Sequence, residues 1–307
     1  MQTQTTVSVI MITYGHEKFI RQAIESILLQ NCNFQIEIIL ANDCSPDNTD
    51  GIIQEILKTN KNACWIKYFN HSKNLGMMPN FEFALSKCTG KYIAICEGDD
   101  YWIDESKLHK QIEFLEKNQD YAIHSGVAQK IKNNILIDEF IGDIETAKTF
   151  ALQDFYHQNN IVTCTVLFRN SIKNYPKDFT SVTFGDWYFY VILLNQTNLK
   201  AYRSTEVLSV YRIHENGVMK SLSQLKFNQQ HISQILKIKK HVGYASFCEI
   251  TKTRLNGYFI SKFKIEVLNY HFFDAIGTFF INLYAVKDLT VFKNYIDSVR
   301  VYLNKKS

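Results

Sequence analysis

The sequence predicts an α/β fold in which a mostly parallel sheet is flanked by helices and followed by a C-terminal helical region. Up to residue 102, apolar runs of strand length alternate with amphipathic runs of helical length, a pattern typical of parallel sheets. From Leu222 onward, helical periodicity dominates and aromatic residues are dense. We therefore expect a first domain over residues 1–220 and a helical region over residues 221–307.

The N-terminal part of the expected sheet consists of four buried strands. Each is a short apolar run bounded by turn formers: residues 7–14, 36–41, 64–69 and 92–96. Amphipathic runs that place apolar side chains on one face occupy the connections: residues 20–30, 49–57 and 80–88. Thr49 is the expected N-cap of the second helix.

The elements after the fourth strand are less regular. Asp104 is a candidate N-cap for a helix that carries Leu108 and Leu115, and residues 121–130 form a lone strand-like run. Residues 133–216 mix loops and short strands, with one helix that contains Trp187. Ligands of open parallel sheets bind beyond the carboxyl ends of the strands, so we expect the site in the polar turns that follow them.

The composition is that of a globular protein. Its 307 residues are 46% apolar and 21% charged, which disfavours disorder. The net charge of +4 comes from 34 basic and 30 acidic residues that are well mixed, so we expect no nucleic-acid partner. Seven widely spaced cysteines without a CxxC pair indicate reduced thiols and no zinc site. We find no signal-peptide pattern and no run approaching the ~20 apolar residues of a membrane span, and therefore expect a cytoplasmic protein.

The most informative stretch is Glu97-Gly98-Asp99-Asp100, directly after the fourth expected strand. Carboxylates this close repel one another and lose hydration unless a cation or hydrogen-bond donors compensate. Oxygen ligands of this kind suit Mg²⁺ or Mn²⁺ shared with substrate phosphates. A solvated acidic turn is the alternative interpretation. Asp43 follows the second expected strand, so we expect Asp43 and Asp99 to share one site.

Three segments, in this order, resemble the signatures of family-2 glycosyltransferases with the GT-A fold. They are residues 7–14 (VSVIMITY), 42–49 (NDCSPDNT) and 97–102 (EGDDYW). The resemblance covers about the first two-thirds of the chain. It implies a Rossmann-like sheet and the transfer of a sugar from a nucleotide diphosphate-sugar, with inversion at the anomeric carbon and with Mg²⁺ or Mn²⁺ bound. UDP is the nucleotide that the family uses most often.

The resemblance places Thr13, Tyr14 and Asp43 in the nucleoside pocket, where the Tyr14 ring covers the base and Asp43 accepts a base N–H. Packing of Tyr14 on the core, and an Asx-turn or helix-cap role for Asp43, are the alternatives. Asn74 and Gly76 resemble the segment that approaches the diphosphate-sugar. An ordinary loop glycine is the alternative for Gly76.

The same resemblance makes Asp99 and Asp100 the expected metal ligands. Glu97 stands where the family commonly has the first Asp of an Asp-x-Asp motif, and its longer side chain is expected to reach a ribose hydroxyl or a metal-bound water. His214 resembles the residue that completes the metal shell, and Arg212 is expected to pair with phosphate. A purely structural histidine is the alternative for His214.

Residues 184–187 (FGDW) resemble the family motif whose carboxylate removes the proton from the acceptor hydroxyl. Asp186 is therefore the expected general base of a direct displacement. A carboxylate that caps the following helix is the alternative. Residues 163–169 look like a strand beside the acceptor pocket.

The expected reaction is the transfer of a sugar to a hydroxyl of a glycan or lipid-linked acceptor in the synthesis of a cell-surface polysaccharide such as lipopolysaccharide or capsule. Two rival functions stay open, a sugar-1-phosphate nucleotidyltransferase and a non-catalytic nucleotide-sugar-binding protein. A dinucleotide-dependent dehydrogenase and a P-loop NTPase are excluded because neither fingerprint occurs. The aromatic clusters and lysines of the C-terminal region allow peripheral contact with the inner face of the cell membrane, or an oligomer interface.

Overall fold

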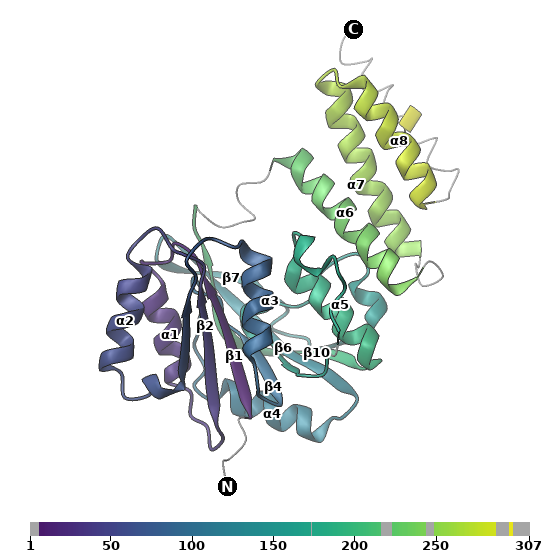
Figure 1. Ribbon diagram of the computed structural model, residues 1–307. Helices are drawn as coiled ribbons and strands as arrows, with labels where there is room; N and C mark the ends of the chain where they lie inside the picture. The colour runs from purple at the N-terminus through teal and green to yellow at the C-terminus, as the bar shows by residue number, and fades with distance from the viewer. Residues whose placement is uncertain (1–5, 173, 216–222, 244–248, 287–294, 297–307) are drawn as a thin grey trace. The chain divides into compact units, whose positions relative to one another are not determined.

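The structure is a computed structural model that describes residues 6–172, 174–215, 223–243, 249–286 and 295–296 (Figure 1). The chain divides into two compact units. The first, the sheet unit, comprises Met1–Leu152 and Asn159–His214, and the second, the helical unit, comprises Gln153–Gln158 and Glu215–Ser307. The helical unit thus takes in a short segment from the middle of the chain, which no sequence pattern separates from its neighbours.

One mixed sheet organises the sheet unit. Its strand order is β3-β2-β1-β4-β9-β6-β10-β5, with β7 beside β6 and β8 beside β10. The strands are β1 (Val7–Thr13), β2 (Ile36–Asn42), β3 (Ile66–Asn70), β4 (Tyr92–Ile95), β5 (Tyr101–Trp102), β6 (Tyr121–Lys132), β7 (Ile135–Ile141), β8 (Lys148–Phe150), β9 (Leu167–Arg169) and β10 (Lys200–Ile213). β1 to β4 are mutually parallel, and β6 is parallel to β10. The remaining pairs are antiparallel. The predicted fold class is confirmed.

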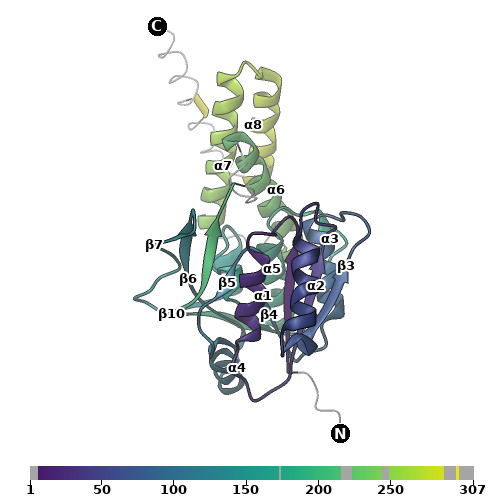
Figure 2. The ribbon, with the colours of Figure 1, turned by 90° about the vertical axis from the view of Figure 1, so that its left-hand side faces the viewer.

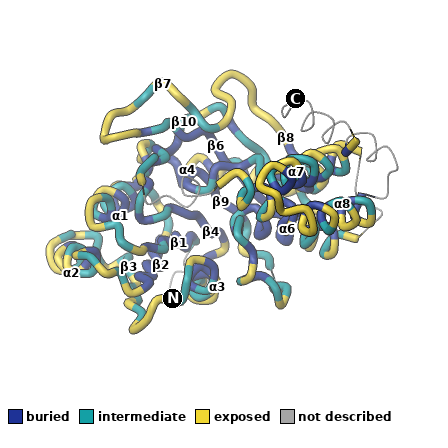
Figure 3. Tube along the Cα trace, turned by 90° about the horizontal axis from the view of Figure 1, so that it is seen from above, coloured by how far each residue is buried: buried dark blue, intermediate teal, exposed yellow. Residues whose placement is uncertain are grey.

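In the described part of the sheet unit, α-helices flank this sheet: α1 (Ile20–Leu28), α2 (Thr49–Thr59), α3 (Met77–Lys87), α4 (Lys107–Lys117) and α5 (Gly185–Thr197). α1 and α2 lie on one side of β1 and β2, and α3 lies on the other (Figures 1 and 2). The successive residues Val9 and Ile10 point to opposite faces and are both fully buried. Because both faces are covered, these strands are buried along their length (Figure 3) and read as continuous apolar runs.

Several element boundaries differ from those expected. β3 begins at Ile66 because Ala63–Trp65 forms a 3₁₀ turn. α3 begins at Met77, before the expected residue 80. Within residues 163–169, only Leu167–Arg169 is a strand, and Thr163–Thr165 forms another 3₁₀ turn. Short 3₁₀ turns carry the same apolar residues as strands, so the apolar pattern does not separate them.

Two predicted helix caps are wrong. Thr49 is the first residue of α2, and the Asp47 carboxylate accepts both its N–H, at 3.1 Å, and its hydroxyl, at 2.5 Å. α4 begins at Lys107 rather than directly after Asp104. The Asp104 carboxylate accepts the N–H of Ser106 at 2.8 Å, in the turn before the helix. In both cases an aspartate two residues upstream satisfies an N–H of the helix start or of the residue preceding it.

The largest departure from the sequence prediction is β10. Residues 133–216 were expected to hold only loops, short strands and one helix, yet β10 runs for 14 residues. It pairs in parallel with β6, and the register shifts between Arg203 and Val207 and again between Val207 and Ser209. Such irregularities move side chains from one face to the other, so the alternation of apolar and polar residues that marks a strand is broken.

In its described part, the helical unit contains α6 (Gln224–Val242), α7 (Glu249–Leu268) and α8 (Phe272–Val286). α7 packs against both α6 and α8. The Ser223 hydroxyl caps α6 by accepting the N–H of Lys226 at 3.3 Å. The expected C-terminal helical region is confirmed. Over the described ranges, no helix combines the length and the apolar content that a membrane crossing requires.

Candidate active site

The polar turns that follow β2 and β4 lie on either side of the end of β1. The Asp43 N–H donates to the Thr13 carbonyl at 2.9 Å, and the Gly98 N–H donates to the Ile12 carbonyl at 3.0 Å. The strand order β2-β1-β4 produces this arrangement, because parallel neighbours end at the same edge. The turns that carry Asp43 and Asp99 therefore belong to one edge of the sheet.

Asp43 fixes the loop that precedes α3. Its two carboxylate oxygens accept the N–H groups of Leu75 and Gly76 at 2.7 and 2.9 Å. Gly76 has a φ of +93°, which favours glycine. Asp43 is thus neither a helix cap nor an Asx-turn residue. Its neighbour Asn42 supports the turn instead, because Asn42 Oδ1 accepts the N–H and the hydroxyl of Ser45 at 3.1 and 2.6 Å.

Tyr14 and Asn74 are the most accessible of the predicted donor-binding residues. The Tyr14 side chain follows β1 and is 49% exposed, so it does not pack into the core. Asn74 is exposed and lies in the loop that Asp43 holds. Thr13, in contrast, is buried, and its hydroxyl lies 3.1 Å from His16 Nδ1. At the end of β1, the exposed Tyr14 thus follows the buried Thr13.

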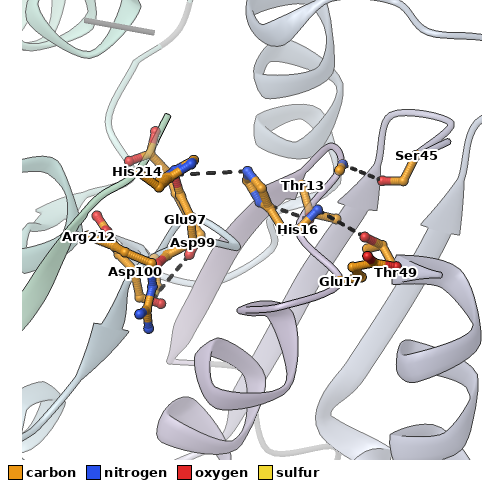
Figure 4. Close-up of polar contacts among 12 residues, drawn as sticks. Thr13, His16, Glu17, Ser45, Thr49, Glu97, Asp99, Asp100, Arg212 and His214 are labelled. Carbon is orange, nitrogen blue, oxygen red and sulfur yellow. Dashed lines mark hydrogen bonds and ion pairs between the residues drawn. The ribbon is translucent and has the colours of Figure 1, made fainter. Parts of the chain in front are cut away.

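Asp99 lies between two imidazoles (Figure 4). His214, directly after β10, places Nε2 2.9 Å from Asp99 Oδ2, and His16, after β1, places Nε2 3.9 Å from the same oxygen. Burial raises the pKa of Asp99, but the hydrogen bond with His214 and the nearby His16 outweigh it, so the pKa is lowered. Asp99 is therefore the ionised member of the acidic turn.

The other two carboxylates of the turn have the opposite electrostatics. Burial, reinforced by the neighbouring carboxylates, raises the pKa of Glu97 and of Asp100 well above the usual range. Asp100 is almost fully buried, and its Oδ1 accepts the N–H of Arg212 at 2.8 Å. Asp186 contributes to the raised pKa of Glu97, which brings that distant carboxylate into the same electrostatic environment. Burial and mutual repulsion thus disfavour ionisation of Glu97 and Asp100.

Arg212 holds the acidic turn against β10 and α1. Its guanidinium donates to the Asp99 carbonyl at 2.9 Å, to Gln22 Oε1 at 2.8 Å and to Asn134 Oδ1 at 3.3 Å. It also lies 4.5 Å from the centre of the Phe19 ring. Only 7% of the residue is exposed. Three of the five guanidinium N–H groups thus bond to protein groups. The phosphate pairing expected for Arg212 stays a prediction.

Asp186 lies in the first turn of α5. The N-cap position is Phe184, with no side-chain cap, so Asp186 is not the capping residue. Its Oδ2 accepts hydrogen bonds from Asn159 Nδ2 at 2.8 Å and from the Thr163 hydroxyl at 2.6 Å. Burial raises the pKa of Asp186, and these hydrogen bonds only partly offset the effect. Asp186 is thus a partly buried carboxylate that two polar side chains hold in place.

Sequence reasoning missed three side chains of this site. Asn159 and Thr163 orient Asp186, and His16 joins Thr13 to Asp99. His16 also donates its backbone N–H to the Thr49 hydroxyl at 3.0 Å, which fixes the turn after β1. The one available signal was its position two residues after the end of the first strand motif.

The residues fit a divalent ion that is shared with a ligand. Within the described ranges, no three His, Cys, Asp or Glu side chains are arranged to hold a metal by themselves. Asp99 Oδ2 and His214 Nε2, however, are 2.9 Å apart, close to the spacing of adjacent ligands in an octahedral shell with bonds of about 2.1 Å. Ions such as Mg²⁺ take few protein ligands and complete their shell with phosphates and water.

Solved structures define the fold class. The chain is similar to S. aureus TarS 1–349 in complex with UDP-GlcNAc, with a TM-score of 0.60 and 17% identity over 96% of this chain and 79% of that chain. It is also similar to the mannosyltransferase PcManGT from Pyrobaculum calidifontis in complex with GDP-Man and Mn²⁺, with a TM-score of 0.56 and 14% identity over 100% and 89% of the two chains. The architecture is thus that of GT-A enzymes.

Sequence comparison gives the family. The model of glycosyl transferase family 2 matches residues 8–175, and the chain belongs to this family. An uncharacterized protein of Mycobacterium tuberculosis is 29% identical over 219 residues, which span 70% of this chain but only 60% of that protein. The UDP-Glc:α-D-GlcNAc-diphosphoundecaprenol β-1,3-glucosyltransferase WfaP of Escherichia coli is 28% identical, over 76% of this chain and 88% of WfaP.

Proposed function

We propose that the protein is an inverting glycosyltransferase that transfers a sugar from a UDP-sugar to a hydroxyl of a glycan or lipid-linked acceptor. The single observation that carries the proposal is the pairing of Asp99 with His214 at the edge of the sheet, with a second carboxylate, Asp186, in the same electrostatic environment. The Asp99–His214 pair suits the leaving diphosphate, and Asp186 suits the attacking hydroxyl.

The donor nucleoside is assigned to the end of β1. The exposed Tyr14 ring is available to cover the base, and Asp43 and Thr13 supply polar groups beside it. Gly76 and Asn74 follow in the loop that Asp43 holds, which suits a segment that approaches the diphosphate-sugar. This loop is anchored by two backbone hydrogen bonds, so a ligand would meet it with little loss of conformational entropy.

Asp99 and His214 are the proposed ligands of Mg²⁺ or Mn²⁺. When bound, the ion supplies positive charge that stabilises the departing nucleoside diphosphate. Asp100 was expected as a second ligand, but its hydrogen bond to the Arg212 N–H supports a positioning role. Glu97 is proposed to receive a ribose hydroxyl or a metal-bound water. The Mn²⁺ complex of the structurally similar PcManGT supports a divalent ion in this fold.

Asp186 is the proposed general base. The acceptor oxygen attacks the anomeric carbon, its proton passes to the Asp186 carboxylate, and the bond between that carbon and the diphosphate oxygen breaks on the opposite side. Direct displacement of this kind inverts the configuration. Asn159 and Thr163 hold the carboxylate by its Oδ2, which leaves Oδ1 without a side-chain donor in the described part of the chain. Acid–base assistance of this kind contributes roughly 10²–10⁴-fold to a rate.

The names of two relatives support a lipid-linked or polysaccharide acceptor. WfaP is named for transfer to a diphosphoundecaprenol-linked sugar, which is a lipid-linked acceptor. Another relative, TuaG of Bacillus subtilis, is named as a putative teichuronic acid biosynthesis glycosyltransferase. By analogy we assign this protein to cell-surface polysaccharide synthesis in the cytoplasm, at the inner face of the membrane.

The proposal is tested with a panel of nucleotide-sugars. We expect a UDP-sugar to raise the melting temperature in the presence of Mn²⁺ and not after chelation with EDTA. The same donor should release UDP in the presence of an acceptor. UTP formation from the donor and pyrophosphate would identify a nucleotidyltransferase instead. Metal-dependent binding without UDP release across a broad acceptor panel would indicate a non-catalytic binding protein.

The hydrogen bond from Thr163 to Asp186 should be visible in the pH profile of transfer. This bond favours the ionised carboxylate, so Thr163→Val is expected to raise the Asp186 pKa further. Because the base must be ionised, the acid limb of kcat/KM should move to higher pH. Thr59→Val, at an exposed hydroxyl that contacts only its own helix, is the matched control. If the acid limb does not move, Asp186 is not the group whose ionisation controls it.

A further inference from the structure

The helix α8 exposes large apolar side chains along one face. On its outer face, Phe273 is 92% exposed, Phe280 is 61%, Ile281 is 54% and Ile276 is 53%. These residues recur at helical spacing, and α8 shows exposed positions along its length (Figure 3). A contiguous exposed apolar face of this kind indicates an apolar partner.

The inner face of α8 combines the apolar Ala275, Ala285 and Val286 with two polar residues. Thr278 and Asn282 are almost fully buried. The Thr278 hydroxyl donates to Glu266 Oε2 at 2.7 Å, and Lys262 of α7 bonds to both of these residues. Asn282 Nδ2 donates to Asn256 Oδ1 at 2.7 Å and to the Tyr295 hydroxyl at 2.9 Å. Hydrogen bonds to Glu266, Lys262, Asn256 and Tyr295 thus hold both polar side chains inside the helical unit, although Asn282 Oδ1 has no hydrogen-bond partner in the described part of the chain.

The charge distribution selects the partner of this face. Residues 223–307 contain 13 Lys and Arg residues and five Asp and Glu residues, a formal charge of +8, whereas residues 1–222 carry −4. A second copy of the chain would bring the same positive charge to the same face and would be repelled. An anionic lipid surface attracts it. Two of the lysines that suggested membrane contact do not contribute directly, because Lys239 is buried against the Ala285 carbonyl and Lys262 pairs with Glu266.

We propose that the outer face of α8 (Phe273, Ile276, Phe280 and Ile281) inserts among the headgroups of an anionic lipid bilayer, to which the net positive charge of residues 223–307 attracts the helical unit. A helix that lies in the interface needs only one apolar face and need not span the bilayer. The inference goes beyond the proposed glycosyl transfer and does not depend on it, since it concerns only the helical unit.

Vesicle flotation tests the proposal. The full-length protein should float with vesicles of phosphatidylcholine and phosphatidylglycerol, far less with phosphatidylcholine alone, and less in high salt. Phe273→Ser combined with Phe280→Ser should lower the bound fraction about tenfold or more, because each removes a buried aromatic group from the bound state. Leu29→Ser, at a residue of the sheet unit that is also 61% exposed, is the matched control.

Two control measurements show whether the variants remain folded and keep the same oligomeric state. Thermal unfolding should be unchanged in all variants because the replaced side chains are exposed, and light scattering should give the same mass for each. Absence of flotation, or flotation that is indifferent to the double substitution, overturns the proposal. A wild-type oligomer that the substitutions dissociate in the absence of lipid would assign the face to self-association instead. UDP release measured without vesicles reports separately on the proposed reaction.

Discussion

Replacing Asp186 with Asn is expected to lower kcat for sugar transfer by about 10³-fold and to leave the affinity for the nucleotide-sugar unchanged. Asparagine keeps the size of the side chain and can still accept from Asn159 and Thr163 through its oxygen. It cannot take a proton from the acceptor hydroxyl. Titration calorimetry with the donor and steady-state assays of UDP release separate the two effects.

The same substitution should not cost stability. Burial raises the pKa of Asp186 above its value in the unfolded chain. An acid with a raised folded-state pKa lowers the free energy of unfolding once it ionises, and this penalty is present at neutral pH. The neutral amide in Asp186→Asn avoids it, so the melting temperature at pH 7 should be equal or higher. A large fall in melting temperature, or full activity, would contradict the role assigned to Asp186. Asp138→Asn, at an exposed carboxylate, is the control.

Replacing Asp99 with Asn is expected to remove both metal binding and metal-dependent donor binding. The carboxylate is ionised because His214 and His16 lower its pKa against the effect of burial, and its charge is what a divalent ion would be drawn to. We expect Mn²⁺ affinity to fall at least tenfold. We expect kcat/KM to fall roughly 10²–10³-fold, which is the usual effect of removing one electrostatic contact to the transition state. Electron paramagnetic resonance of free Mn²⁺ measures the binding directly.

Binding measurements alone should therefore distinguish the roles of Asp186 and Asp99, without an assay of sugar transfer. Asp186→Asn should bind Mn²⁺ and donor like the wild type, whereas Asp99→Asn should bind neither. His214→Gln should resemble Asp99→Asn in direction, because His214 Nε2 is the second proposed ligand. Normal Mn²⁺ binding by Asp99→Asn would place the ion elsewhere and would remove the basis for the assignment of the leaving-group side of the site.

The parts of the fold that sequence predicted well are those with strong local signals. β1, β2 and β4 are covered on both faces, so each is a continuous apolar run of strand length followed by turn formers. β10 lacked such a signal because register shifts interrupt its alternation. The cap at Thr49 was misplaced because Asp47, two residues upstream, accepts the Thr49 N–H, and sequence alone does not decide which of two nearby acceptors lies at the helix start.

The candidate site divides in the same way. The chemical types were readable from sequence: carboxylates after two parallel strands, a flexible glycine at residue 76 and a carboxylate beside Trp187. The hydrogen-bond and ion-pair partners of those groups could not be read from sequence. Three of the five guanidinium N–H groups of Arg212 donate to Gln22, Asn134 and the Asp99 carbonyl, which no local pattern indicates. For His16 the sequence offered only its position two residues after the first strand motif, although the side chain lies beside both Thr13 and Asp99.

The sequence by itself determined the chemistry at each strand end, because the residues of one turn are covalent neighbours and stay together in any fold. Only the tertiary structure decided which of these turns meet. Asp99 and His214 are separated by 115 positions, yet their polar atoms lie 2.9 Å apart because β5 and β10 pair in the sheet. Hydrogen bonds act over about 3 Å, so strand order, which no local pattern encodes, fixes the electrostatics of the site.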